Sequence, residues 1–245
     1  MPHTKNYYWR IAGFYFFYYA FVGMFAPYWS LYLKSIHFDA IEIAILMSVQ
    51  PVMRMIAPTL WGWLADRTGK RLLVVQIAAT LSAVCYLGVF ATTGFWGMFL
   101  VLALMGFFWS ASMPLVEATT LSYLGKHSAR YGRIRSWGSI GFIASVVGLG
   151  YAFDYIAIAW LLWAGVVCEL GILIFSRQIP DIEAQAHHTD HQPVKQIIMQ
   201  PRVLALFSAC FLMSVAHGPY YTFYSIIWSN TAMQKARWVV CGHWA

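Results

Sequence analysis

Few ionisable side chains lie inside the long apolar segments of this sequence, and those few are the first candidates for chemistry. Glu117 lies within one apolar segment, and Arg135 stands at the start of the next. A charge inside a membrane is costly unless it is paired or hydrated, so each of these residues is a functional candidate. A carboxylate and a guanidinium on adjacent antiparallel helices can pair across a cavity, and Ser139 and Phe142 follow Arg135 on the same helical face. We therefore predict that these four residues face a common cavity.

Three other ionisable residues, Arg54, Glu169 and His217, also lie in apolar segments. Arg54 is about three turns from either end of its segment, where snorkelling to the interface is difficult, so it needs a carboxylate, a hydrated cavity or an anionic substrate. Glu169 is either a proton-coupling residue or, as we favour, a side chain that reaches toward the nearby membrane interface. His217 can carry a proton at physiological pH, or it is a hydrogen-bonded structural residue. With Glu117, these last two residues complete the set of proton-coupling candidates.

The composition excludes several classes of protein. Hydrophobic residues make up 60% of the 245-residue chain and charged residues only 10%, a balance that soluble globular domains do not reach. The formal net charge is +7, but the basic residues lie in short loops and form no continuous face for a nucleic acid. No convergent Ser, His and Asp arrangement or intramembrane metal motif supports an enzyme, and no cofactor is indicated. The cysteines lack metal-ligand spacing and are interpreted as packing residues: Cys85, Cys168, Cys210 and Cys241.

Seven apolar segments position these residues. Each is long enough to cross about 30 Å of hydrocarbon as a helix. The sequence therefore predicts an all-α, polytopic protein embedded in a lipid bilayer. The segments are Ile11–Leu33, Ile43–Leu64, Leu72–Ala91, Phe95–Leu124, Ser136–Phe153, Tyr155–Phe175 and Val203–Trp228.

Basic residues alternate between the loops and indicate the orientation. They precede the first segment and follow the second, fourth and sixth, whereas Lys34 is alone on the opposite side. Because Lys and Arg concentrate in cytoplasmic loops, we expect the N-terminus in the cytoplasm. The aromatic residues at the two ends of the first segment are interpreted as interfacial belts: Tyr7, Tyr8, Trp9, Tyr28, Trp29 and Tyr32.

A polar stretch divides the chain into unequal parts. We predict a six-helix bundle over residues 1–176, a cytoplasmic linker over 177–202, a seventh helix over 203–228 and an atypical tail over 229–245. The tail has no clear apolar face, and we interpret it as the product of a shifted reading frame or of a truncation. His187, His188, Asp190 and His191 in the linker are of types that bind divalent metals, but a solvated linker without metal is the favoured interpretation.

A short charged turn separates the second and third segments. Its glycines permit a tight reversal, and its basic residues hold it on the cytoplasmic side. The run resembles the signature between helices 2 and 3 of the major facilitator superfamily, and its residues are Gly62-Trp-Leu-Ala-Asp66-Arg67-Thr-Gly69-Lys70-Arg71. Ala26–Tyr32 and Gly218–Tyr224 also match in residue class at every step, like the duplicated halves of that superfamily. The resemblance implies two six-helix bundles with substrate between them, alternating access that this turn helps to switch, a monomer, and a bacterial inner membrane location.

The fourth and fifth segments show a closer resemblance, to the lactose permease group. The similar runs are Pro114-Leu-Val-Glu117 and Arg133-Ile-Arg135-Ser-Trp-Gly138-Ser139-Ile-Gly141-Phe142. In that group the matching Glu and second Arg bind the substrate, which implies this role for Glu117 and Arg135. Phe142 stands where lactose permease has Trp, which leaves specificity for a sugar open. The alternative for Arg133 and Arg135 is that both are ordinary cytoplasmic anchors.

Arg54 and the His-Gly-Pro-Tyr-Tyr-Thr run from His217 resemble the phenylpropionate permease branch related to that group. This resemblance implies proton-coupled symport of a small aromatic carboxylate, with symport of a sugar or nucleoside as the alternative. The family architecture places helices 1, 2, 4 and 5 around the cavity, so Glu117 is the expected partner of Arg54. A transport-inactive fragment is a further alternative, because the remaining helices of the second bundle are absent from the sequence. We expect the seven helices to insert without transporting solute.

Overall fold

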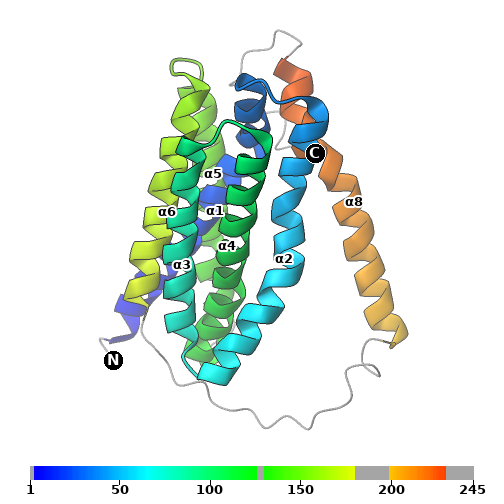
Figure 1. The fold of residues 1–245 in the computed structure, drawn as a ribbon. Helices are drawn as coiled ribbons and strands as arrows, with labels where there is room; N and C mark the ends of the chain where they lie inside the picture. The colour runs from blue at the N-terminus through cyan, green and yellow to red at the C-terminus, as the bar shows by residue number, and fades with distance from the viewer. Residues whose placement is uncertain (1–2, 126–129, 180–198, 230–245) are drawn as a thin grey trace.

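The computed structural model describes residues 3–125, 130–179 and 199–229, and this part of the chain is helical without strands. Long helices follow one another along the bundle (Figure 1). The prediction of an all-α fold is confirmed. The long helices are α1 (His3–Ser35), α2 (Ala40–Thr68), α3 (Arg71–Leu87), α4 (Phe95–Leu124), α5 (Tyr131–Ala152), α6 (Leu161–Gln178) and α8 (Pro201–Ser229), and the short 3-10 helices are η1 (Gly88–Ala91) and η3 (Ile158–Trp160).

Six of these helical stretches are long and apolar enough to cross a membrane, counted over the described residues. The protein is therefore a multi-pass membrane protein. The stretches do not include α5, which has 22 residues but is rich in Gly and Ser and carries Arg133 and Arg135. Each predicted segment corresponds to one long helix, with differences at the ends. One of these differences is at the start of the sixth segment. The chain turns after Ala152 and passes through η3, so α6 begins at Leu161 and not at Tyr155.

Local sequence signals explain where α2 begins and ends. Asp39 and Glu42 form a capping box, in which the Glu42 N–H donates to Asp39 Oδ1 at 2.7 Å and the Asp39 N–H donates to Glu42 Oε2 at 3.0 Å. At the other end, Gly69 has φ of 66° and its N–H donates to the Ala65 carbonyl. A residue with a side chain is strained in this left-handed conformation, so Gly69 permits the reversal into α3.

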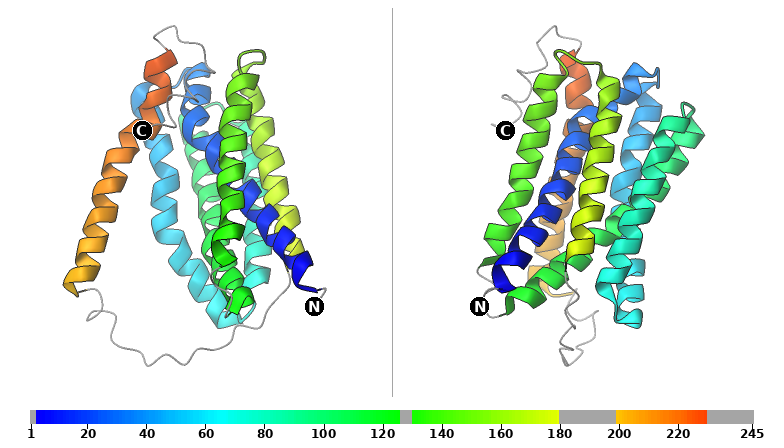
Figure 2. Two further views of the ribbon diagram at one scale, coloured as in Figure 1. Left: turned by 180° about the vertical axis from the view of Figure 1, so that it is seen from behind. Right: turned by 90° about the vertical axis from the view of Figure 1, so that its left-hand side faces the viewer.

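Helix α1 lies in the middle of the bundle, where it packs against α5 and α6, and α4 packs against α2 and α3 (Figure 1). Figure 2 shows α1 crossing at an angle between α5 and α6. Tyr28, Trp29 and Tyr32 of α1 are all buried in the resulting core. Their interpretation as an interfacial belt was therefore wrong, because this end of α1 is covered by other helices. Trp9, at the opposite end, is 59% exposed.

Small residues allow α1 and α5 to approach closely. A methyl group added at Gly141 of α5 would overlap the backbone carbonyl of Phe16, and one added at Gly138 would overlap the ring of Tyr19. From the α1 side, Gly23 lies against the backbone of Phe142. Packing of backbone against backbone through glycine is a common basis of helix association in membranes. Gly148 of α5 differs from these glycines, because no atom lies within 4 Å of a methyl group added there.

The basic ends of the described helices gather at one end of the bundle. The start of α1, the α2–α3 turn, the end of α4 and the start of α5 all lie at the bottom of Figure 1, and the end of α1 lies at the top. This arrangement agrees with the loop pattern of Lys and Arg, and the cytoplasmic assignment of that end stays a prediction. Helix α8 stands beyond α2, contacts α1, and is exposed along residues 201–218 except for the half-buried Val203.

The glycine packing leads to a matched pair of substitutions. Gly141→Ala should destabilise the bundle by about 1 to 3 kcal/mol, because the added methyl group has no space beside Phe16. Gly148→Ala should be neutral or stabilising by about 0.5 to 1 kcal/mol, because that position is open and Ala favours a helix. Thermal unfolding of the purified variants in detergent, followed by circular dichroism, compares the two. Equal melting temperatures would contradict the close approach of α1 and α5.

Candidate substrate-binding site

The membrane-embedded charges lie around three tyrosines of α1. Tyr15 and Tyr18 are buried and Tyr19 is half-buried, and all three sit within little more than one helical turn. Arg135 of α5 lies beside Tyr15 and Tyr19. Arg54 of α2 reaches the same turn through Trp109 of α4, which stacks on Tyr18. Helix α1 thus brings the two arginines of α2 and α5 to one region of the bundle.

The guanidinium of Arg135 rests on aromatic rings. Its Cζ lies 4.5 Å from the ring centroid of Tyr19 and 5.5 Å from that of Tyr15. A cation over a ring face is attracted by the ring quadrupole, and this attraction is stronger away from water. Nη1 of Arg135 is buried and has no hydrogen-bond partner among the described residues, and the buried hydroxyl of Tyr15 lies near Thr120 and Tyr131. The cation is therefore held mainly by ring contacts, and part of its hydrogen-bonding capacity is unused.

Glu117 of α4 completes this group. Its Oε1 accepts a hydrogen bond from the hydroxyl of Tyr131, at the start of α5, and Glu117 also interacts electrostatically with Arg135. The predicted pairing of Glu117 with Arg135 is not formed as an ion pair among the described residues, because Tyr131 is the direct partner of the carboxylate. Sequence reasoning missed Tyr131, although its position one turn before Arg135 on the same helix was a usable signal.

Ser139 and Phe142 continue along α5 from Arg135. Ser139 is exposed, and Phe142 is half-buried with its backbone against Gly23 of α1. One turn further, the carbonyl of Val146 accepts a hydrogen bond from Tyr28 at 2.7 Å. Phe142 thus has a packing role at the α1–α5 contact, and its predicted role in stacking on a substrate stays a prediction.

Arg54 contacts an aromatic ring and forms no ion pair with a described residue. Its Cζ lies 4.8 Å from the ring centroid of Trp109, and the ring of Trp109 stacks on Tyr18 with centroids 4.1 Å apart at 12°. The expected pairing of Arg54 with Glu117 is not formed, because Glu117 is held by Tyr131. Sequence reasoning missed Trp109, which is 1% exposed. Its position as the one tryptophan near the middle of the fourth segment was a usable signal.

Glu169 is buried between α6 and α3. It is 1% exposed, its Oε1 accepts a hydrogen bond from Ser82 Oγ at 3.1 Å, and its Oε2 has no partner among the described residues. The favoured interpretation, that Glu169 reaches toward the membrane interface, was wrong. The side chain points into the α3–α6 contact because Ser82 offers a donor there.

His217 lies on α8, and its Nδ1 is 2.8 Å from the carbonyl of Met213, one turn earlier in the same helix. This contact fits the structural alternative, and the carriage of a proton by His217 stays a prediction. The histidines of the linker, His187, His188 and His191, lie outside the described residues. Within the described parts of the chain, no group of three or more His, Cys, Asp or Glu side chains is placed to hold a metal ion.

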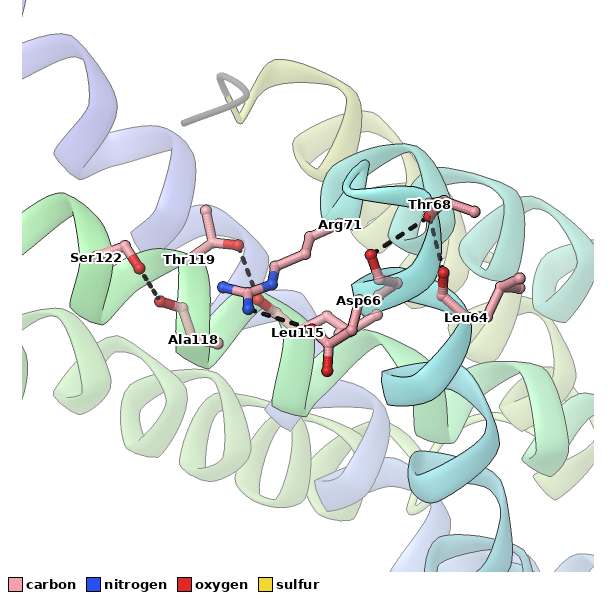
Figure 3. Close-up of polar contacts among 9 residues, drawn as sticks. Leu64, Asp66, Thr68, Arg71, Leu115, Ala118, Thr119 and Ser122 are labelled. Carbon is pink, nitrogen blue, oxygen red and sulfur yellow. Dashed lines mark hydrogen bonds and ion pairs between the residues drawn. The ribbon is translucent and has the colours of Figure 1, made fainter. Parts of the chain in front are cut away.

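The charged turn between α2 and α3 is shown in Figure 3, where Arg71 and Asp66 point toward one another. Arg71 Nη2 lies 3.3 Å from Asp66 Oδ1, across the reversal at Gly69. The carboxylate of Asp66 thus anchors Arg71 of the next helix. Gly62 lies within α2 with open space around it, so only Gly69 supplies the backbone freedom of the turn.

The other members of this turn are its basic residues. The guanidinium of Arg67 lies 5.2 Å from the ring centroid of Trp63, one turn earlier on α2. Lys70 precedes α3 and makes no side-chain capping bond. Thr68 donates to the carbonyls of Leu64 and Ala65, which helps to satisfy the end of α2 (Figure 3).

The helical bundle, with ionisable residues inside its long apolar helices, defines a class, the multi-pass membrane proteins. Comparison with known families makes this specific: the model of the MFS_1 like family matches residues 8–240. The chain belongs to this family of the major facilitator superfamily, as the charged turn indicated.

Named relatives support the same family. The chain is 33% identical over 172 residues to a protein named maltose permease from Geobacillus stearothermophilus, covering 68% of this chain and 43% of the relative. It is 28% identical over 230 residues to a probable 3-phenylpropionic acid transporter from Escherichia coli K12, covering 90% of this chain and 59% of the relative. The chain thus spans about half the length of the curated relatives it matches.

A solved structure shares the fold. The crystal structure of the D323A mutant of the nucleoside transporter NupG superposes with a TM-score of 0.72 at 20% sequence identity, covering 89% of this chain and 57% of that chain. At this identity the likeness shows the fold alone.

The geometry of the charged turn predicts a selective effect of Asp66→Asn. The carboxylate is 71% exposed, and an exposed ion pair contributes at most about 1 kcal/mol, so the melting temperature and the affinity for solute should hardly change. The rate of solute uptake is expected to fall, because the ion pair ties α2 to α3 in the turn that the family resemblance implies helps to switch the bundle. Solute binding and uptake by the same variant separate the two effects. A loss of affinity equal to the loss of transport rate would count against this role.

Proposed function

We propose that this chain contributes the first helical bundle of a secondary active transporter that moves a small organic solute by alternating access. The observation that carries the proposal is the cluster of Glu117, Tyr131 and Arg135 beside the tyrosines of α1, inside the membrane-spanning bundle. Ionised groups are costly there and are typical of substrate and ion pathways. The names of the relatives, which include permeases and transporters, support the same activity.

A small aromatic carboxylate is the substrate that we favour. Arg54 and Arg135 are cationic, and aromatic rings surround both. The probable 3-phenylpropionic acid transporter is similar over 90% of this chain. A sugar or a nucleoside is the second candidate, supported by the names of the maltose permease and of the nucleoside transporter.

We propose that a proton gradient drives the transport of the solute. Three residues are candidates to carry the proton. Glu117 shares a hydrogen bond with Tyr131 beside Arg135, so arrival of an anion changes its electrostatic surroundings. Glu169 accepts a hydrogen bond from a neutral hydroxyl and has no cation within salt-bridge distance among the described residues. His217 is the third candidate, on α8.

The proposed organisation follows from the same family. Residues 1–176 form the first bundle, residues 177–202 link it to the helix over 203–228, and the tail begins at 229. We place the N-terminus on the cytoplasmic side of a bacterial inner membrane and propose a monomer. The partners are a small organic solute, a proton and the lipid bilayer, without nucleic acid, and the proposal includes neither enzymatic activity nor a cofactor or metal.

Neutralising Glu117 tests the proposed site. Glu117→Gln should weaken solute binding by at least about 30-fold, because it removes the carboxylate that accepts the hydrogen bond of Tyr131 and that interacts electrostatically with Arg135. Glu42→Gln is the matched control, since it removes a carboxylate from an exposed capping box that also accepts Gln. Binding of 3-phenylpropionate, maltose and uridine to each purified chain gives both the affinity and the substrate class. An unchanged affinity of Glu117→Gln for the solute would contradict the assignment of Glu117 to the binding site.

A further inference from the structure

Three polar side chains where α2 meets α4 have no hydrogen-bond or ion-pair partner among the described residues. Resting on the proposed function, we propose that Arg54, Gln50 and Trp109 form a carboxylate-binding subsite, backed by Tyr18 of α1. The subsite takes the anionic group of a small organic monoanion. Glu117, Tyr131 and Arg135 then contact the rest of the same solute.

The charge of Arg54 has no counterion in the described residues. The one ion pair among them joins Asp66 and Arg71 at the end of the bundle. Arg54 lies near the middle of α2, and its side chain is exposed along the bundle face. A guanidinium held inside a membrane requires water or an anion. It also presents a planar set of donors that matches a carboxylate, which favours that group over a point anion.

Trp109 holds Arg54 and is unavailable as a platform for a sugar ring. Its ring stacks on Tyr18 with centroids 4.1 Å apart, which covers one face. The guanidinium of Arg54, 4.8 Å from the ring centroid, lies over the other face. Sugars are often held by stacking on an open indole face, and no face of Trp109 is open. The arrangement instead positions a cation for an anionic ligand.

Gln50 supplies a second donor close to Arg54. It lies four residues before Arg54 on α2, so both side chains occupy one helical face. Its amide packs against Gly106, three residues before Trp109 on α4. Gln50 is 4% exposed, and its Nε2 and Oε1, like the Nε1 of Trp109, have no hydrogen-bond partner among the described residues. Buried donors without partners are costly, and a carboxylate oxygen would satisfy them.

The charges of the site fit a solute with a single negative charge. Arg54 and Arg135 each contribute one positive charge, and Glu117 contributes one negative charge, which leaves one positive charge to be balanced. Glu169 does not enter this sum, because it is buried against Ser82 between α3 and α6. A neutral sugar or nucleoside would leave Arg54 without a counterion.

Ligand-dependent thermal unfolding of the purified full chain in detergent tests the subsite. The probes are 3-phenylpropionate and its uncharged isostere 3-phenylpropionamide, at equal concentrations. Wild type should melt roughly 5 °C higher with a hundredfold excess of the carboxylate over its Kd, and should respond little to the amide. Arg54→Gln should weaken binding of the carboxylate by at least about 30-fold.

Gln50→Leu separates binding from a structural role. Leu fills the same space without a buried donor, so the ligand-free variant should melt at the same or a higher temperature while its response to the carboxylate falls. Arg10→Gln is the control. Arg10 also lies over a tyrosine ring, but it is near the N-terminal start of α1, so the response of this variant to the carboxylate should equal that of wild type.

Four outcomes would count against the subsite. Equal stabilisation of wild type by the carboxylate and the amide, or a full response in Arg54→Gln, would refute it while the proposed binding of an aromatic solute stands. A lower melting temperature in Gln50→Leu with an unchanged response would assign Gln50 to structure alone. Wild type that responds to neither compound would refute the proposed aromatic substrate together with its carboxylate subsite.

Discussion

The close approach of α1 and α5 is the contact on which the candidate site depends. Gly138 and Gly141 bring the backbone of α5 against Tyr19 and Phe16, and Gly23 receives Phe142 from the other side. Because a side chain at any of these positions would separate the helices, the glycines determine how far Arg135 lies from the tyrosines of α1. The hydrogen bond from Tyr28 to the carbonyl of Val146 holds the same pair of helices nearer their other end.

Aromatic rings, and no ion-paired carboxylate among the described residues, contact Arg54 and Arg135. Arg54 rests on Trp109, and Arg135 rests on Tyr15 and Tyr19. A salt bridge would neutralise each arginine within the protein and leave little attraction for an anion. A ring attracts the cation without cancelling its charge, so the guanidinium stays oriented and able to bind an anionic solute. This property suits a carrier, which must bind its solute and then release it.

Glu169 and the charged residues of the α2–α3 turn are arranged differently from these two arginines. Glu169 is enclosed between α3 and α6 with one hydroxyl donor, apart from the groups that would meet a solute. Asp66 and Arg71 pair at the exposed end of the bundle, where water weakens the attraction. The same chain thus uses a weak ion pair where movement is proposed and aromatic contacts where a charge must remain available.

The sequence alone determined the helices, the family and the identity of most of the charged residues, because long apolar runs, the reversal at Gly69 and lone charges inside those runs are local signals. It did not determine which way each helix faces. In a membrane both the lipid-facing and the core-facing sides of a helix are apolar, so periodicity does not separate them. For this reason the burial of Tyr28, Trp29 and Glu169, the open position of Gly148, and the contacts of Arg54 with Trp109 and of Glu117 with Tyr131 were decided only by tertiary packing.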